Sequence, residues 1–123
     1  MATVSDYVLD QALAVFDTEA NEIHITSQEA TDFTDATSTS TLGSSSSLDI
    51  SAPADRTEGG REVTVSAIAD GTVTADGTAS HYAIVDTVNN RLLSTDTLTN
   101  AQPVTNGNSF SLEEFKIFIP DPS

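Results

Sequence analysis

Cysteine and tryptophan are absent from this chain of 123 residues, and only four residues are Lys or Arg. Without cysteine there is no disulfide and no thiolate ligand for a metal, so redox chemistry gives no indication of the compartment. A membrane-spanning helix needs about 18 consecutive apolar residues, and no such run occurs. The stretch "MATVSDYVLD" at residues 1–10 lacks the basic start and apolar centre of a signal peptide. We therefore expect no membrane association, no ordinary export and production in a cytoplasm.

The scarcity of basic residues leaves a strongly acidic chain, with 19 carboxylates and a formal net charge of -15. Binding to nucleic acid or to an anionic membrane needs clustered Lys and Arg, so we expect neither as a partner. The acids are unevenly spread, because residues 1–60 hold eleven acids and one Arg while residues 61–123 hold eight acids and three bases. A surface of this kind suits a basic protein partner or a salty environment.

Strand signals dominate the pattern of the chain. Threonine is abundant, and its branched Cβ favours strands. Segments of alternating polarity, such as "REVTVSAI" (61–68), are separated by turn formers such as the Asp-Gly pairs at 70–71 and 76–77. The pattern predicts an all-β fold, with one domain over residues 1–123 that forms an antiparallel β-sandwich or barrel of about seven or eight short strands with one short helical turn. Alternation assigns six residues to the structural core: Val63, Val65, Val85, Phe115, Ile117 and Ile119.

The amino-terminal part allows two interpretations. "LAVFDTEANEIHIT" (13–26) fits a hairpin around a polar loop, with residues 1–10 as an extended arm. A helix over residues 6–16, capped by Ser5, is the alternative. Further along, Thr31 is placed to cap one helical turn that reaches Ala36, with Phe33 as its anchor. Residues 43–60, which contain "SSSS" and "PADRTEGG", are expected to form flexible loops.

The second half has more regular signals. "TVNNR" (87–91) predicts a turn that joins strands 79–86 and 91–98 into a hairpin. In "SFSLEEFKIFI" (109–119), strict alternation puts the apolar residues before and after Glu113–Glu114 on opposite faces. One extra residue at that point would bring them onto one face, so a β-bulge is expected there.

"DGTASHYAIVD" (76–86) contains the residue types of a hydrolase triad. On an extended strand Ser80 and His81 point to opposite faces, so they are expected not to meet as nucleophile and base. Asp86 falls on the Ser80 face, and no G-x-S-x-G elbow is present. We interpret His81 as a partly buried, hydrogen-bonded strand residue and expect no enzymatic activity and no catalytic residues.

The histidines, the acidic residues and the glycine-containing stretch "TEGGRE" follow no known metal-binding or cofactor-binding motif. Two histidines without cysteine would need carboxylates to complete a zinc site. The acids do not follow the EF-hand calcium loop, and "TEGGRE" precedes a strand where a phosphate loop would precede a helix. We expect no cofactor and no dedicated metal site, although divalent cations on clustered surface carboxylates stay open.

Three stretches, at residues 8–43, 53–86 and 90–120, resemble a group of small proteins of tailed bacteriophages, and "DGTASHYAIVD" followed by "RLL" is the most recognisable part. The resemblance covers nearly the whole chain and carries no catalytic motif. Proteins of this group are encoded among virion-structure genes. The resemblance therefore implies a structural component of the virion, in the first place a decoration or cement protein on the outside of the head.

A decoration protein implies particular partners. The expected partner is the major capsid protein, the expected location is the capsid surface, and the expected assembly is a homo-oligomer, with a trimer favoured because decoration proteins match lattice symmetry. Residues 1–10 and the acidic residues 17–58 are the expected contacts. The alternatives are a tail, neck or fibre-associated structural protein, and a carbohydrate-binding surface module. The latter needs exposed aromatic platforms, for which the chain offers only Tyr7 and Tyr82 as large polar aromatics.

Overall fold

The computed structural model describes residues 5–57 and 59–120, and the chain forms two compact units. Unit 1 comprises residues 1–19, 49–67 and 113–123, and unit 2 comprises residues 20–48 and 68–112. Two segments with continuous strand signals, 61–68 and 109–119, each pass from one unit into the other.

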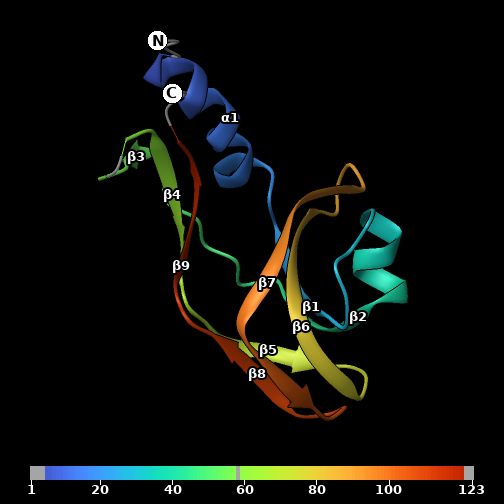
Figure 1. Ribbon diagram of the computed structural model, residues 1–123. Coiled ribbons are helices and arrows are strands. Elements are labelled where there is room, and N and C mark those ends of the chain that lie inside the picture. The colour runs from blue at the N-terminus through green and yellow to red at the C-terminus, as the bar shows by residue number, and fades with distance from the viewer. Residues whose placement is uncertain (1–4, 58, 121–123) are drawn as a thin grey trace. The chain divides into compact units, whose positions relative to one another are not determined.

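Strands make up about half of the chain and helices 17%, which confirms the all-β fold class. Figure 1 labels the elements along the chain. The strands are β1 (Glu22–Thr26), β2 (Thr41–Ser45), β3 (Ala54–Asp55), β4 (Arg61–Val65), β5 (Ile68–Val73), β6 (Gly77–Asp86), β7 (Arg91–Val104), β8 (Ser109–Leu112) and β9 (Phe115–Ile119). The helices are α1 (Asp6–Thr18) and the one-turn π-helix η1 (Asp35–Thr39).

Unit 2 is built on a curled antiparallel sheet of six strands in the order β7-β6-β1-β2-β5-β8. The predicted hairpin is present, with β6 and β7 joined through residues 87–90. β6 also pairs with β1 on its other side, where Ile23 lies opposite Ile84. Every residue from Tyr82 to Asp86 is buried, as expected for a strand that is apolar on both faces. Val85, a predicted core residue, is fully buried.

The helical residues of unit 2 begin at Phe33, inside the expected turn between Thr31 and Ala36, and continue through η1. Just before them, Asp32 Oδ1 accepts a hydrogen bond of 2.7 Å from the Asp35 backbone N–H. The predicted cap, Thr31, instead donates to the Asp35 carboxylate. Phe33 is the anchor, as predicted, and packs against a buried cluster of small side chains: Ala30, Ala36, Ala83 and Val85.

Unit 1 begins with α1, so the hairpin over 13–26 is wrong and the alternative helix, capped by Ser5, is right. The Ser5 hydroxyl accepts a hydrogen bond from the Val8 backbone N–H. Leu9 and Leu13 are one helical turn apart and both buried, and α1 packs on β4. The predicted extended arm over 1–10 is therefore wrong for residues 6–10, which are helical, while residues 1–4 lie outside the described part.

The sheet of unit 1 has the order β3-β4-β9. Val63 and Val65 on β4 are fully buried, as predicted. The Arg61 guanidinium, also on β4, donates to the Asp10 carboxylate of α1 at 2.7 Å and to that of Asp55 on β3 at 2.6 Å. These two bonds raise the pKa of Arg61 further above its already high ordinary value. One cation therefore links the helix and two strands of the unit.

The expected bulge at Glu113–Glu114 is wrong. β8 pairs with β5 in the sheet of unit 2, whereas β9 pairs with β4 in unit 1, so the two halves belong to different sheets. As a consequence, Phe115, Ile117 and Ile119 are less buried than the predicted core residues should be. All three are half-buried and alternate with exposed neighbours, because β9 is an edge strand.

The predicted flexible loop over 43–60 is also partly wrong. Gly43 pairs with Val73 of β5, Ile50 forms a bridge with Val65, and Ala54 pairs with Glu62. Three separate backbone pairings thus hold this segment, one of them at Ile50 within the short apolar stretch "LDIS".

Gly71 is a close-packing point in unit 2 that can be tested. A Cβ at this position would lie 2.3 Å from the Phe110 ring, which is itself buried. We expect Gly71→Ala to lower the free energy of unfolding by about 1–3 kcal/mol, because the ring has no room to move away. Denaturant unfolding measures this change, and Phe110→Leu is the matched background in which the cost should fall. An equal cost in both backgrounds would contradict the contact.

Candidate functional site

Ser80 and His81 do meet, contrary to the prediction that strand geometry keeps them apart. The Ser80 hydroxyl lies 2.8 Å from His81 Nδ1. The register of β6 against β7 shifts at this point, since Ala79 pairs with Gln102 and His81 with Thr97. The additional residues at this shift belong to β7, whereas β6 pairs with β1 in unbroken register through His81 and Tyr82.

The Ser80 hydroxyl has two neighbours that can accept its single proton. Its oxygen lies 2.8 Å from His81 Nδ1 and 3.1 Å from the Ser27 carbonyl oxygen, and the tautomer of His81 decides which of them accepts. The contact alone therefore assigns neither a nucleophile nor a base. His81 is half-buried and hydrogen-bonded, which confirms its interpretation as a strand residue of that kind.

Asp86 is occupied elsewhere. Its carboxylate accepts hydrogen bonds from the Val88 and Asn89 backbone N–H groups and from the Asn89 side-chain amide. These bonds, the Asn89 side chain first, hold the pKa of Asp86 below its ordinary value. The residue closes the β6–β7 turn and takes no part in a relay with His81.

The other histidine forms a cluster that the sequence reasoning missed. His24 on β1 is buried, with Nδ1 2.8 Å from the Thr41 hydroxyl of β2 and Nε2 2.5 Å from Glu22 Oε1. Glu22 and His24 are two residues apart on one strand and therefore share a face, which is a signal the sequence does contain. Thr41, seventeen residues away, is brought in only by the β1–β2 pairing.

Burial has the largest effect on the pKa of His24. It lowers this pKa below 6.5, and the hydrogen bond to Glu22 acts in the opposite direction. The neutral ring then donates through Nε2 to Glu22 and accepts at Nδ1 from Thr41. The Thr41 hydroxyl also lies 3.2 Å from the Gly43 carbonyl oxygen. A hydroxyl, an imidazole and a carboxylate are thus in line, but the ring they share is 5% exposed, and the arrangement fixes strand pairing.

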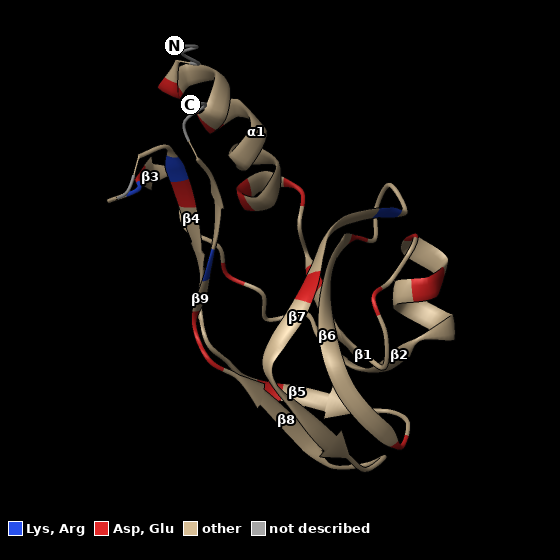
Figure 2. Ribbon diagram, in the orientation of Figure 1, with Lys and Arg blue, Asp and Glu red and all other residues tan. Residues whose placement is uncertain are grey.

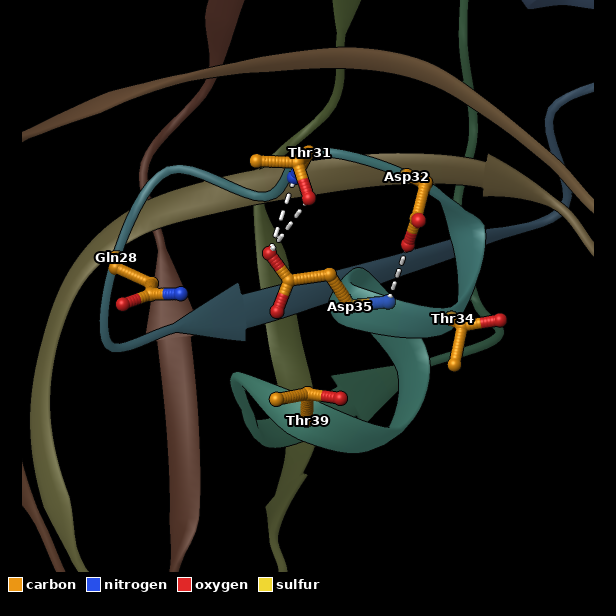
Figure 3. Close-up of a pocket in the computed structure, with 6 residues that line it drawn as sticks. All are labelled: Gln28, Thr31, Asp32, Thr34, Asp35 and Thr39. Atoms are coloured by element: carbon orange, nitrogen blue, oxygen red, sulfur yellow. Dashed lines mark hydrogen bonds between the residues drawn. The ribbon is translucent and has the colours of Figure 1, made fainter.

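The polar pocket of unit 2 lies beside η1 and is drawn in Figure 3. Asp35 is its one buried residue, and the other five are exposed: Gln28, Thr31, Asp32, Thr34 and Thr39. The Asp35 carboxylate accepts from the Thr31 backbone N–H at 3.0 Å and from the Ser40 hydroxyl at 2.5 Å. These bonds, that of Ser40 first, lower the pKa of Asp35. Its oxygens are already engaged by donors of the chain, so the carboxylate organises the segment around η1.

The basic residues are distributed unequally between the units. Figure 2 shows acidic residues on α1 and between β8 and β9, and basic residues on β3–β4 and β9. Lys116 on β9 donates to Glu62 of β4 at 2.7 Å, and the Arg56 guanidinium lies 3.9 Å from the centre of the Phe118 ring. With Arg61, three of the four basic residues of the chain therefore lie in unit 1 and contact groups of that unit.

Within residues 5–57 and 59–120, no cluster of three or more His, Asp or Glu side chains is placed to hold a metal ion. In the same part of the chain, no helix combines the length and the apolar character needed to cross a membrane. No family model, no curated protein and no solved structure matches the chain.

The burial of His24 predicts a pH-dependent stability. The unfolded chain takes up a proton at pH 6.5, whereas folded His24 does so only at lower pH. Stability should therefore be complete above pH 6.5 and fall as the pH drops toward the folded pKa. The carboxylates with lowered pKa, such as Asp35, lose their contribution only below 3.8 and lie outside this window.

Denaturant unfolding over about pH 5 to 8 measures this effect. His24→Gln should flatten the dependence, and His81→Gln, the matched control, should leave the His24 contribution in place. A slope in His24→Gln equal to that of the unaltered protein would contradict the assignment.

The Ser80–His81 contact gives a second prediction. His81→Ala should leave hydrolysis of ester and amide substrates at background, because the Asp86 carboxylate is held in the β6–β7 turn and does not complete a triad with the pair. A chromogenic substrate screen of both proteins tests this. Turnover by the unaltered protein that disappears in His81→Ala would show that the pair is catalytic.

Proposed function

We propose that this protein is a structural component of a bacteriophage virion, a decoration or cement protein that binds the outside of the head and stabilises the lattice of the major capsid protein. It would assemble in the host cytoplasm and remain on the capsid surface, without cofactor or enzymatic activity. The alternative is a tail, neck or fibre-associated structural protein of the same virion.

The main support for the proposal is where the stretch that resembles the bacteriophage proteins lies in the structure. The most recognisable stretch, residues 76–86 followed by 91–93, coincides with β6 and the start of β7. Its apolar residues are the buried centre of the unit 2 sheet, and its polar residues close the turn or bond to neighbouring backbone. A resemblance of this kind supports a shared structural role.

The charge supports the same role. A capsid surface protein lies close to packaged DNA without binding it, and a net charge of -15 disfavours any contact with phosphates. The acidic residues are suited to Lys and Arg on a partner such as the major capsid protein. Such contacts accelerate association and weaken as the salt concentration rises.

The carbohydrate-binding alternative is less well supported. Sugar recognition needs aromatic rings exposed together on one surface. Tyr7 is 71% exposed on α1 in unit 1, whereas Tyr82 is 8% exposed inside the sheet of unit 2. The two tyrosines thus do not supply a shared platform within either unit.

Purified particles of the encoding phage test the proposal. Heads and tails are separated, and quantitative mass spectrometry measures the copy number of this chain relative to the major capsid protein. We expect the chain in the head fraction, in numbers comparable with capsid subunits, and cryo-electron microscopy should place it on the outer surface. Density at three-fold positions would support the favoured trimer.

Two controls make this experiment decisive. Antibody added to intact particles should bind only if the chain is outside, so labelling that requires disrupted heads would contradict an outer position. Presence of the chain in isolated tails alone would overturn the decoration role and favour the tail alternative.

A further inference from the structure

β9 is an edge strand of the unit 1 sheet. It is the last strand of the order β3-β4-β9, and no other described strand pairs with its far side. Its five residues pair with β4 in unbroken register from Phe115 to Ile119. From Lys116 to Ile119, an edge of this kind is a template for a further strand.

The two edges of unit 2 are less suited to strand addition. β7 changes register twice against β6 and contains Pro103, which has no N–H to donate. β8 has only four residues. β9 is free of such features, and Lys116, its one charged residue, is held by Glu62 of the neighbouring strand.

The side chains of β9 leave apolar surface uncovered on both faces. Ile117 lies opposite Val63 on β4, which is fully buried beneath α1, yet Ile117 itself is only half-buried. Ile119 is likewise half-buried, and Phe118 on the opposite face is 49% exposed although the Arg56 guanidinium lies over its ring. An added strand would bury more of each, because neighbouring strands in a sheet shield one another's side chains.

Charge decides which kind of strand fits this edge. The segments of unit 1 contain eleven acidic residues and three basic ones, Arg56, Arg61 and Lys116, which gives a net -8. Glu113 and Glu114, directly before β9, are exposed. A second copy would bring the same negative charge to the edge, whereas a segment with flanking Lys or Arg would compensate it.

We propose that β9 accepts an extended segment of a partner protein as the fourth strand of the unit 1 sheet, and that this segment alternates apolar and polar residues and carries Lys or Arg at its ends. Backbone hydrogen bonds supply the pairing, the half-buried face of β9 selects apolar side chains, and Glu113 and Glu114 attract the basic end that lies beside them. The site rests on the proposed function only for the identity of the protein that carries the segment.

A synthetic peptide of alternating Val and Thr with Lys at both ends is the probe. Fluorescence anisotropy of the labelled peptide, titrated with the full chain, should show saturable binding that weakens with salt. Two N-methylated peptides provide the matched comparison, each blocking the N–H groups on one side of the strand. Only one side faces β9, so one peptide should lose binding and the other should keep it.

Equal behaviour of the two methylated peptides, or no saturable binding of the parent peptide, would overturn the proposal. Because these comparisons use the unaltered protein, they do not depend on any variant folding. Their failure would also leave the head location untouched, since the particle experiment measures location without reference to β9.

A protein variant locates the contact. Ile117→Asp should weaken peptide binding about tenfold or more, because the added strand would bury an ionised carboxylate. Val88→Asp, at a position that is 81% exposed in unit 2, is the matched control and should bind normally. Circular dichroism verifies that each variant is folded. Normal binding by folded Ile117→Asp, or a dimer in sedimentation experiments that the peptide dissociates, would overturn the assignment of the edge to a basic partner.

Discussion

Backbone pairing along β6 is the interaction on which the larger unit depends. This ten-residue strand pairs with β1 on one side and β7 on the other, and it joins segments that lie more than fifty residues apart in the chain. With no disulfide to hold such distant segments, their alignment depends on hydrogen-bonded register and on apolar side chains that match across strands, as Ile23 and Ile84 do. The polar clusters at His24 and Asp35 lie next to this framework and inherit their positions from it.

The sequence predicts those structural features that are determined by residues close together in the chain. The β6–β7 hairpin follows from a turn-forming stretch between two alternating runs, and Val63, Val65 and Val85 follow from alternation alone. Residues 6–18 carry both helix and strand signals, and the choice of helix reflects the packing of Leu9 and Leu13 on a strand some fifty residues away. Alternation likewise cannot reveal that Phe110 and Phe115 belong to different sheets, because it reports a face and never a partner strand.

The polar sites likewise combine contacts that can be predicted from nearby residues with contacts that depend on distant strands. Glu22 and His24 are two residues apart on a strand, so their contact is readable from the sequence, whereas the third member, Thr41, depends on the register of β2. The contact between Ser80 and His81 is not predicted, because alternation points adjacent side chains to opposite faces, yet their polar atoms lie within hydrogen-bonding distance. The register shift beside them adds residues on β7, and the sequence of β6 carries little sign of it.

The discontinuous composition of unit 1 has a consequence for the order in which the protein is made. Its helix, its middle strands and β9 come from the beginning, the middle and the end of the chain, whereas unit 2 is complete once residue 112 has been synthesised. During translation the sheet of unit 2 can therefore close first, while α1 and β4 wait for their last partner. Until β9 emerges, the edge of β4 that pairs with it has no neighbouring strand. Unit 1 thus reaches its final form later than unit 2, and its apolar residues stay accessible to aggregation and proteolysis for longer.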